Sequence, residues 1–304
     1  MSFLSHFAPG DRPSGAYFLP FLEGLAAVME NMPPAALTAD ATLWANAVPR
    51  AARLVGASGI AVGVLPMIAA ESFGATVMRV GANASVVARP ETPVPEPWCA
   101  APLANLLETG RRLAETVRPE RELAVFMSGP VTLSQALFGE MPSPSRLGVL
   151  KAGLLKCLEL ICEARPDVVF IDENWAGHPP EATPELRRFH NTLKNVADYY
   201  GVGYGLRVEG IRDVPAAIAS LSGLRVAHLM LGGDAEGSLP DVRVAANAAA
   251  AAGWTSVGLP VAAGCDVDEA LAACDMPAIA AYLCGAAQET DIEFLKSVGL
   301  RMRR

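Results

Sequence analysis

Short apolar runs recur along the chain, and segments with helical periodicity separate them. Val168–Ile171 is typical, because four apolar residues lie between the polar end of one segment and a polar turn. Continuous apolar runs of this length are typical of strands that are buried on both faces of a parallel sheet. Eight such runs occur: Tyr17–Phe21, Ile60–Leu65, Leu123–Met127, Val168–Ile171, Tyr204–Val208, Val226–Leu231, Ser256–Leu259 and Ile279–Leu283.

The segments between these runs have the pattern of helices. In Ser145–Ala164 the leucines recur near the helical period. Pro184–Tyr200 and Pro240–Ala252 each have a proline near the start, which suits a first helical turn, and Gly253 is a good helix stop. Strands that alternate with helices predict βαβ units, and eight such units close most naturally into a barrel. We therefore predict an α/β protein with a single (β/α)8 (TIM) barrel domain over residues 1–304.

One segment interrupts the alternation. Ala75–Ala88 has the pattern of two short strands around Gly81-Ala82-Asn83, which indicates a β-hairpin. The proline-rich connector at 89–97 follows it. We expect this hairpin to project from the barrel between its second and third strands.

Composition narrows the class of protein. The chain has 304 residues, of which 52% are hydrophobic, and a net charge of −8. No basic stripe is present, which argues against nucleic acid and anionic membranes as partners. The longest uncharged run, at 244–265, is better explained by a helix and a strand than by a membrane span. The N-terminus lacks signal-peptide features, and six cysteines without a regular spacing indicate free thiols, so we expect a cytoplasmic protein.

Polar residues follow the predicted fourth and fifth strands. Asp172, Glu173 and Asn174 follow the fourth, while Arg207 and Glu209 lie at the end of the fifth. Barrel geometry brings the carboxyl ends of strands to one mouth, where carboxylates around an arginine can bind an anionic group and move protons. We expect Asp172, Glu173, Arg207 and Glu209 to share one cavity, with Arg207 as the anchor for a substrate carboxylate. The alternative is an ion pair that only satisfies buried charge.

Four more residues complete the candidate substrate site. Asn174 lies next to the acidic pair, and Ser128 follows the third strand. Trp175 is expected to line the mouth or to cover the core. His178 lies on the loop beyond, either as a general acid or as a surface residue. We assign catalysis to Asp172, Glu173, Arg207 and His178, and substrate binding to Arg207, Asn174, Trp175 and Ser128.

Three stretches carry a resemblance to a known family. Phe126–Leu133 (FMSGPVTL) is similar to a "GP-[WF]-TL" segment, Phe170–Gly177 (FIDENWAG) is similar to an "FD-S-WAG" stretch, and Leu54–Thr76 matches a second β/α unit in length and order. In these features the chain resembles the uroporphyrinogen decarboxylase superfamily, which includes zinc-dependent cobalamin- and coenzyme M-linked methyltransferases. The resemblance covers most of the chain, roughly residues 15–300, and its motifs are moderately specific.

Departures from the family pattern select one branch. The decarboxylases carry arginines after the first strand and an aspartate after the second, whereas Tyr17–Glu23 has no arginine and Val62–Pro66 has no acid. The resemblance therefore implies the methyltransferase branch. Such an enzyme transfers a methyl group between a small substrate and a corrinoid protein or thiol, with zinc as a cofactor. Barrels of this superfamily often pair, which implies a homodimer.

The metal ligands match the family only in part. The methyltransferases place His-x-Cys after the fifth strand and a cysteine after the eighth, whereas this chain has Arg207-Val208-Glu209 and Cys284 at these places. Zinc accepts mixed sulfur, nitrogen and oxygen ligands. Cys284, Glu209, His228 and Cys265 are therefore the candidate ligands, with Cys284 expected in any metal site. His228 and Cys284 could instead be core residues, while Cys265 lies in the loop after the seventh strand.

Two alternatives to methyl transfer remain open at this point. The first is decarboxylation of a small carboxylic acid, with Arg207 as the anchor and the Asp172 pair as acid and base. The second is a binding or assembly subunit that kept the barrel without catalysis. The substituted ligand positions favour the second alternative, and the acidic cluster opposes it.

Overall fold

The computed structural model describes residues 17–65, 67–80, 83–118, 120–274, 279–285 and 291–302. The N-terminal stretch without signal-peptide features, the Gly81-Ala82 pair predicted in the hairpin and the last two residues of the chain lie outside the described residues.

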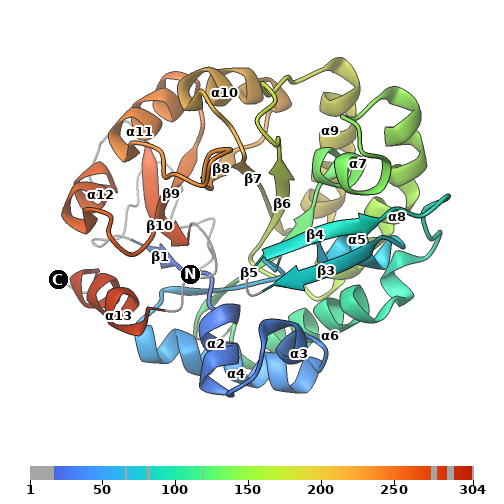
Figure 1. Cartoon of the computed structure of the whole chain (residues 1–304). Coiled ribbons are helices and arrows are strands. Elements are labelled where there is room, and N and C mark those ends of the chain that lie inside the picture. Colours follow the sequence, from blue (N-terminus) through green and yellow to red (C-terminus); the bar gives the residue numbers. More distant parts are fainter. Residues whose placement is uncertain are drawn as a thin grey trace.

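Eight parallel strands form a ring with helices outside it (Figure 1), so the predicted barrel is confirmed. Their order around the ring is β1-β10-β9-β8-β7-β6-β5-β2. Hydrogen bonds between Phe18 and Ser58, at 2.9 and 3.0 Å, link β1 to the residue before β2 and nearly close the ring. The strands are β1 (Phe18–Leu19), β2 (Gly59–Val62), β5 (Glu122–Ser128), β6 (Val168–Asn174), β7 (Gly203–Glu209), β8 (His228–Leu231), β9 (Ser256–Val261) and β10 (Ala280–Gly285).

Helices follow the strands and cover the outside of the ring. They are α2 (Glu23–Met29), α3 (Pro34–Thr38), α4 (Ala41–Val55), α5 (Ile68–Ser72), α6 (Ala101–Thr116), α7 (Pro130–Phe138), α8 (Pro144–Glu163), α9 (Pro184–Tyr200), α10 (Val214–Leu221), α11 (Val242–Ala251), α12 (Val267–Cys274) and α13 (Ile292–Arg301), with the short 3₁₀ helices η1 (Pro97–Cys99) and η2 (Ser222–Leu224). Within the described ranges, no helix is both long and apolar enough to cross a bilayer.

Side-chain capping explains where several helices begin. The hydroxyl of Thr183 accepts from the backbone N–H of Leu186 at 3.2 Å and starts α9. The segment expected to start at Pro240 instead begins at Val242, because the Asp241 carboxylate accepts from the N–H groups of the first turn. Pro240 therefore lies before the helix rather than inside it.

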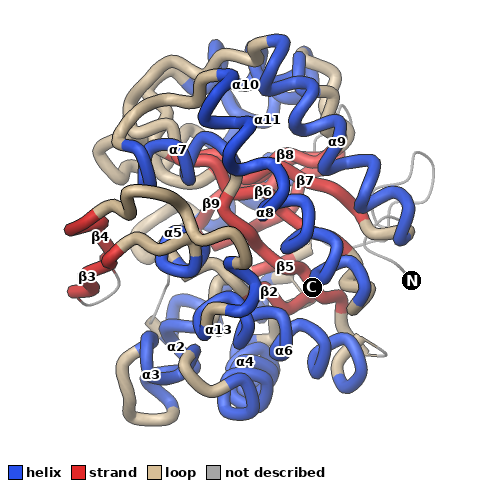
Figure 2. The backbone as a smooth tube through the Cα atoms, turned by 90° about the vertical axis from the view of Figure 1, so that its right-hand side faces the viewer, coloured by secondary structure: helices blue, strands red, loops and turns tan. Residues whose placement is uncertain are grey.

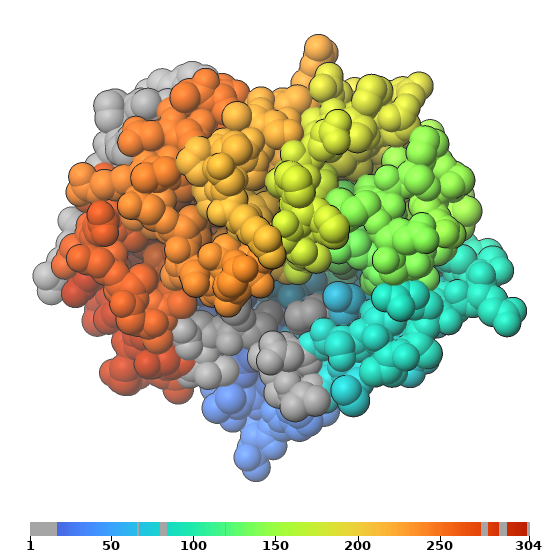
Figure 3. Space-filling view, turned by 45° about the horizontal axis from the view of Figure 1, so that its top comes forward, coloured from blue at the N-terminus to red at the C-terminus, as the bar shows by residue number. Residues whose placement is uncertain are grey.

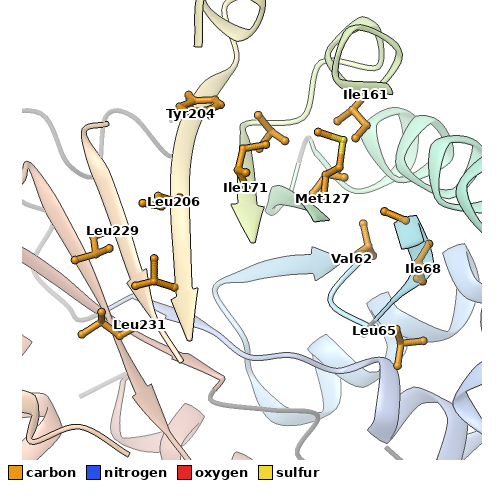
Figure 4. Packing of buried hydrophobic residues seen from close by; sticks show 14 of the residues in the cluster. Val62, Leu65, Ile68, Met127, Ile161, Ile171, Tyr204, Leu206, Leu229 and Leu231 are labelled. Atoms are coloured by element: carbon orange, nitrogen blue, oxygen red, sulfur yellow. The ribbon is translucent and has the colours of Figure 1, made fainter. Parts of the chain in front are cut away.

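Alternation along each strand divides the apolar residues into two groups. On β6, Val169 and Ile171 join the large cluster between the strands and the helices, part of which Figure 4 shows. Val168 and Phe170 instead belong to the smaller cluster inside the barrel. There the Phe170 ring stacks on Phe126 at 5.1 Å between centroids. Side chains therefore fill the barrel up to the level at which the polar strand ends begin.

Gly205 makes room for this interior packing. A Cβ atom on Gly205 would lie 2.3 Å from the ring of Phe170. Gly205 is paired in register with Phe170 on the neighbouring strand. The glycine thus allows two large rings to fit across the barrel below Arg207, which follows two residues later on the same face.

The hairpin is confirmed as an antiparallel pair of β3 (Thr76–Val80) and β4 (Asn83–Ala88). A register shift between Thr76 and Val77 interrupts its regular pairing. Figure 2 shows the pair projecting from the side of the barrel. An ion pair between Arg79 and Glu71, at 2.7 Å, ties the hairpin to α5.

Glu122 lies at the amino-terminal end of the barrel and makes stability depend on pH. Burial, with the charge of Asp167, raises the pKa of Glu122 from 4.5 to about 7, while a hydrogen bond from Tyr17 opposes the shift. A carboxyl group whose pKa is raised by folding stabilises the fold when protonated, and this stability is lost as the pH rises through about 7.

We therefore expect Glu122→Gln to reduce the pH dependence of folding. Between about pH 5 and about pH 8, the free energy of unfolding of the natural protein should fall by about 1–2 kcal/mol more than that of the variant. Urea unfolding at the two pH values measures the difference. Equal losses in both proteins would show that Glu122 does not titrate in this range.

Candidate active site at the mouth of the barrel

The candidate site is formed by the ends of β6 and β7, which pair in parallel register. Asp172 lies opposite Arg207, and Asn174 lies opposite Glu209. Residues two apart on a strand point to the same face. Since Phe170 lies inside the barrel, these four side chains belong to the inner face at its carboxyl end. The structure thus brings together Asp172, Asn174, Arg207 and Glu209.

Arg207 is the centre of this group. One terminal nitrogen, Nη1, donates to Oδ1 of Asp172 at 2.7 Å, and the other, Nη2, lies 2.7 Å from Oε2 of Glu209. The guanidinium also lies over the ring of Phe21, with its Cζ 5.2 Å from the ring centroid. Only 3% of Arg207 is exposed. The two carboxylates and the ring hold it in one position.

Two carboxylates share this single guanidinium, and the pKa of one of them, Asp172, is raised. Burial, followed by the charges of Glu209 and Glu173, raises the pKa of Asp172 from 3.8 to about 7, although Arg207 opposes the shift. The carboxylates in turn raise the pKa of Arg207 despite its burial. Asp172 is thus a carboxyl group that can give or take a proton near neutral pH.

Asn174 orients the second carboxylate. Its Nδ2 donates to Oε1 of Glu209 at 3.1 Å, while its Oδ1 accepts from the backbone N–H of Ala176 at 2.8 Å. Ala176 has a positive φ of 48°, so the chain turns sharply just after the strand. This turn fixes the amide that holds Glu209.

The segments that follow β6, β7 and β8 are hydrogen-bonded to one another in the same order as the strands. The N–H of Gly177 donates to the carbonyl of Gly210, and the N–H of Gly210 donates to that of Gly233, at 2.7 and 2.9 Å. Figure 3 shows the segments after β6 and β8, in yellow-green and orange, close together on one face of the molecule. The rim of the mouth is therefore tied together by backbone hydrogen bonds.

Glu173 does not lie in the mouth, contrary to expectation. Its carboxylate points to the outer face of β6, where Oε2 accepts from the backbone N–H groups of Val131 and Thr132 at 2.9 and 3.0 Å. Only 1% of Glu173 is exposed. Alternation along the strand is the physical reason, because Asp172 and Asn174 take the inner face.

Three other candidates lie at or outside the edge of the site. Trp175 is 2% exposed and packs in the cluster between strands and helices, so it covers the core rather than lining the mouth. His178 is exposed on the loop beyond, where its N–H donates to the carbonyl of Trp175 at 2.9 Å. Ser128 is half-buried and pairs in register with Asp172, which places it beside the cluster.

The candidate zinc ligands do not form a metal site. Among the described residues, no group of three or more His, Cys, Asp or Glu side chains is placed to hold a metal ion. Glu209 is paired with Arg207, whose fixed charge would repel a dication. Cys284 is fully buried with its Sγ 3.7 Å from the carbonyl of Leu231, and burial raises the pKa of its thiol.

The other two candidate ligands are also held elsewhere. His228 hydrogen-bonds to Ser256 at 2.8 Å, and burial lowers the pKa of His228 to about 4. Cys265 is half-buried in the segment between β9 and α12, where burial raises the pKa of its thiol. The residues present therefore do not fit zinc, and no chemical step is assigned to it.

Sequence reasoning missed three residues that shape the site. Phe21 carries the ring beneath Arg207, and Thr132 bridges the backbone on both sides of Glu173. Glu23, at the start of α2, is fully buried and accepts from the N–H of Gly63 at 2.7 Å. Glu23 comes two residues after the predicted first strand, which was the available signal, whereas Thr132 lies five residues beyond the predicted third strand and no local pattern indicated it.

Comparison with known proteins supports the architecture. No protein-family model matches the chain, and no curated protein matches its sequence. A solved methyltransferase from Methanosarcina mazei has a TM-score of 0.74 at 15% identity, over 99% of this chain and 97% of that chain. A B12-independent methionine synthase from Shewanella sp. W3-18-1 has a TM-score of 0.48 at 11% identity, over 86% of this chain and 88% of that chain. The chain thus has a TIM-barrel fold similar to that of the Methanosarcina mazei protein.

Proposed function

We propose that the protein is an enzyme of the methyltransferase kind that acts on a small substrate at the mouth of the barrel. The carrier of the methyl group would be a corrinoid protein or a thiol. The observation that carries the proposal is the cluster at the carboxyl end of the strands, in which the partly exposed Asp172 and Glu209 hold the buried Arg207. The end-to-end likeness of the fold to a methyltransferase supports the reaction class.

The exposure of the cluster indicates what kind of substrate fits. The side chain of Arg207 is 4% exposed and both of its terminal nitrogens are paired, whereas those of Asp172 and Glu209 are 22% and 29% exposed. A substrate therefore meets carboxyl oxygens rather than the guanidinium. These oxygens favour a hydroxyl or amine over a carboxylate. The same geometry argues against Arg207 as the anchor of a decarboxylase.

Asp172 supplies the proton chemistry that methyl transfer needs. A corrinoid or a thiolate supplies the nucleophile that takes the methyl group. The substrate's oxygen or nitrogen keeps the electron pair of the broken bond and requires a proton. Asp172, with a pKa of about 7, donates that proton, and Arg207, at 2.7 Å, stabilises the carboxylate that remains. Glu209 holds Arg207 in place, Asn174 holds Glu209, and the exposed oxygens of Glu209 would bind the substrate.

A methyl-transfer assay tests this function. The natural protein would be incubated anaerobically with small methyl ethers or N-methylamines carrying a 13C-labelled methyl group, with free cob(I)alamin or a small thiol as the acceptor. We expect labelled methyl on the acceptor, followed by NMR, at a rate above the reaction without protein. Release of CO2 from small carboxylic acids without methyl transfer would instead support the decarboxylase. If neither reaction took place, the result would support the binding subunit.

A further inference from the structure

The first turn of α7 is attached to the back of the strand that carries the site. The N–H groups of a first helical turn have no partner within the helix. Here the Glu173 carboxylate accepts from those of Val131 and Thr132. A carboxylate at the positive end of a helix is favourable. An internal anion, rather than a ligand, thus occupies this end of α7.

Thr132 completes the attachment through its hydroxyl group. Its Oγ1 donates to the carbonyl of Asp172 at 2.9 Å and accepts from the N–H of Asn174 at 2.8 Å. Gln135 adds a hydrogen bond from Nε2 to the carbonyl of Asn174 at 2.6 Å. The backbone of both residues that face the mouth is therefore held from behind by α7.

Two further features make this attachment tight. A Cβ atom on Gly129 would lie 2.3 Å from Oε1 of Glu173, so a glycine is required just before the helix. The same Oε1 lies 3.4 Å from Nε2 of His190, whose Nδ1 is 2.8 Å from the hydroxyl of Tyr204 on β7. Glu173 and His190 are each at most 1% exposed. The network therefore links α7, β6, α9 and β7 away from water.

We propose that Glu173 and Thr132 are positioning residues: they fix the end of β6 so that Asp172 and Asn174 meet Arg207 and Glu209 in the mouth. The expected effect of these residues on turnover rests on the proposed function, whereas their effect on the position of Asp172 does not. It assigns a physical role to the Gly129–Leu133 segment and moves Glu173 from a catalytic to a supporting position.

The substitutions Thr132→Val, Glu173→Gln and Thr132→Ser separate this role from simple packing. Thr132→Val removes the bridging hydroxyl at nearly constant size, and Glu173→Gln removes the charge at nearly constant shape. We expect each to lower kcat by about ten- to a hundredfold, with a smaller effect on KM, because misplacement affects the transition state more than binding. Thr132→Ser keeps a hydroxyl and should recover most of the activity.

The titration of Asp172 gives a readout that does not depend on methyl transfer. Thr132→Val should raise the pKa of Asp172 by loosening its contact with Arg207. In Glu173→Gln the lost negative charge lowers the pKa of Asp172 while a loosened contact with Arg207 raises it, so this variant is judged by kcat and not by titration. Infrared spectroscopy of the carboxyl group in the Glu122→Gln background measures the shift in Thr132→Val. Ser134→Ala is the matched control, since Ser134 is buried on the same helix without a hydrogen-bond partner for its hydroxyl and should leave kcat and the titration unchanged.

A raised pKa of Asp172 in Thr132→Val, with unchanged values in Thr132→Ser and Ser134→Ala, would support the positioning role even without methyl transfer. The absence of methyl transfer would then count against the proposed function alone. If Glu173→Gln fails to fold, Thr132→Val and Thr132→Ser still decide the matter. The inference is overturned if Thr132→Val folds with an unchanged titration, or if Thr132→Ser is impaired as strongly as Thr132→Val.

Discussion

Replacing Arg207 with methionine is expected to abolish activity and to lower the free energy of unfolding by about 3–5 kcal/mol. Arg207 is 3% exposed, and each of its terminal nitrogens lies 2.7 Å from a carboxylate oxygen. Methionine approximates its length but leaves Asp172 and Glu209 as two like charges without the cation between them. The pKa of Asp172 should then rise further, because Arg207 no longer opposes the effects of burial and of the nearby carboxylates.

Urea unfolding and the methyl-transfer assay measure these two effects. Arg212→Met is the matched control, because Arg212 is exposed and lies 3.9 Å from an exposed Glu236. A pair of this kind contributes little, so the control should remain within about 0.5 kcal/mol of the natural protein. An Arg207→Met protein as stable and as active as this control would show that the buried cluster is neither a structural nor a functional centre.

The second large effect is expected for Asp172→Asn. The amide keeps the shape of the carboxyl group but cannot donate an acidic proton, so kcat/KM should fall by about 10²–10⁴-fold. In the natural protein, the acid form of Asp172 is lost as the pH rises through about 7, and the rate should fall with it. The residual rate of the variant should not show this decline.

A pH–rate profile of the two proteins tests the assignment. Ser128→Ala is a useful comparison, because Ser128 lies beside Asp172 in register but does not titrate in this range. Its profile should retain the decline near pH 7. If Asp172→Asn kept both the rate and the decline, another group would be the acid.

The barrel could be predicted because its strands are continuous apolar runs. Burial on both faces leaves no other pattern for a parallel strand, and even the short β1 was located as part of Tyr17–Phe21. The start of α11 was placed two residues early, since the proline pattern did not show that Asp241 supplies the cap. The first residue of a helix depends on which side chain accepts hydrogen bonds from the first turn, and a proline in the sequence does not show this.

The candidate site could be predicted in outline but not in its detail. The strand ends predicted that Asp172, Arg207 and Glu209 would meet, and the structure places them together. Alternation along β6 would have placed Glu173 on the other face, although the run Asp172-Glu173-Asn174 looked like one polar cluster. That Glu173 meets a helix terminus depends on the packing of α7, which no local pattern encodes.

The proposed metal site shows a different limit. Cys284 matched a family position along the chain, but whether donors converge depends on where neighbouring side chains point. Arg207 pairs with Glu209, and Cys284 lies against a carbonyl of the barrel wall. Matching Cys284 to a family position therefore gave its place on a strand, but it did not show which side chains or carbonyl groups its thiol contacts.

A proton held at the mouth of the barrel near neutral pH is central to the proposed function, and infrared difference spectroscopy measures it most directly. The titration should be made in the Glu122→Gln background, because the pKa values of Glu122 and Asp172 are both raised to about 7. We predict that a protonated carboxyl signal titrates near pH 7 in this background and disappears when Asp172→Asn is added. The account would be contradicted if no carboxyl group titrated near neutral pH, or if the signal persisted without Asp172.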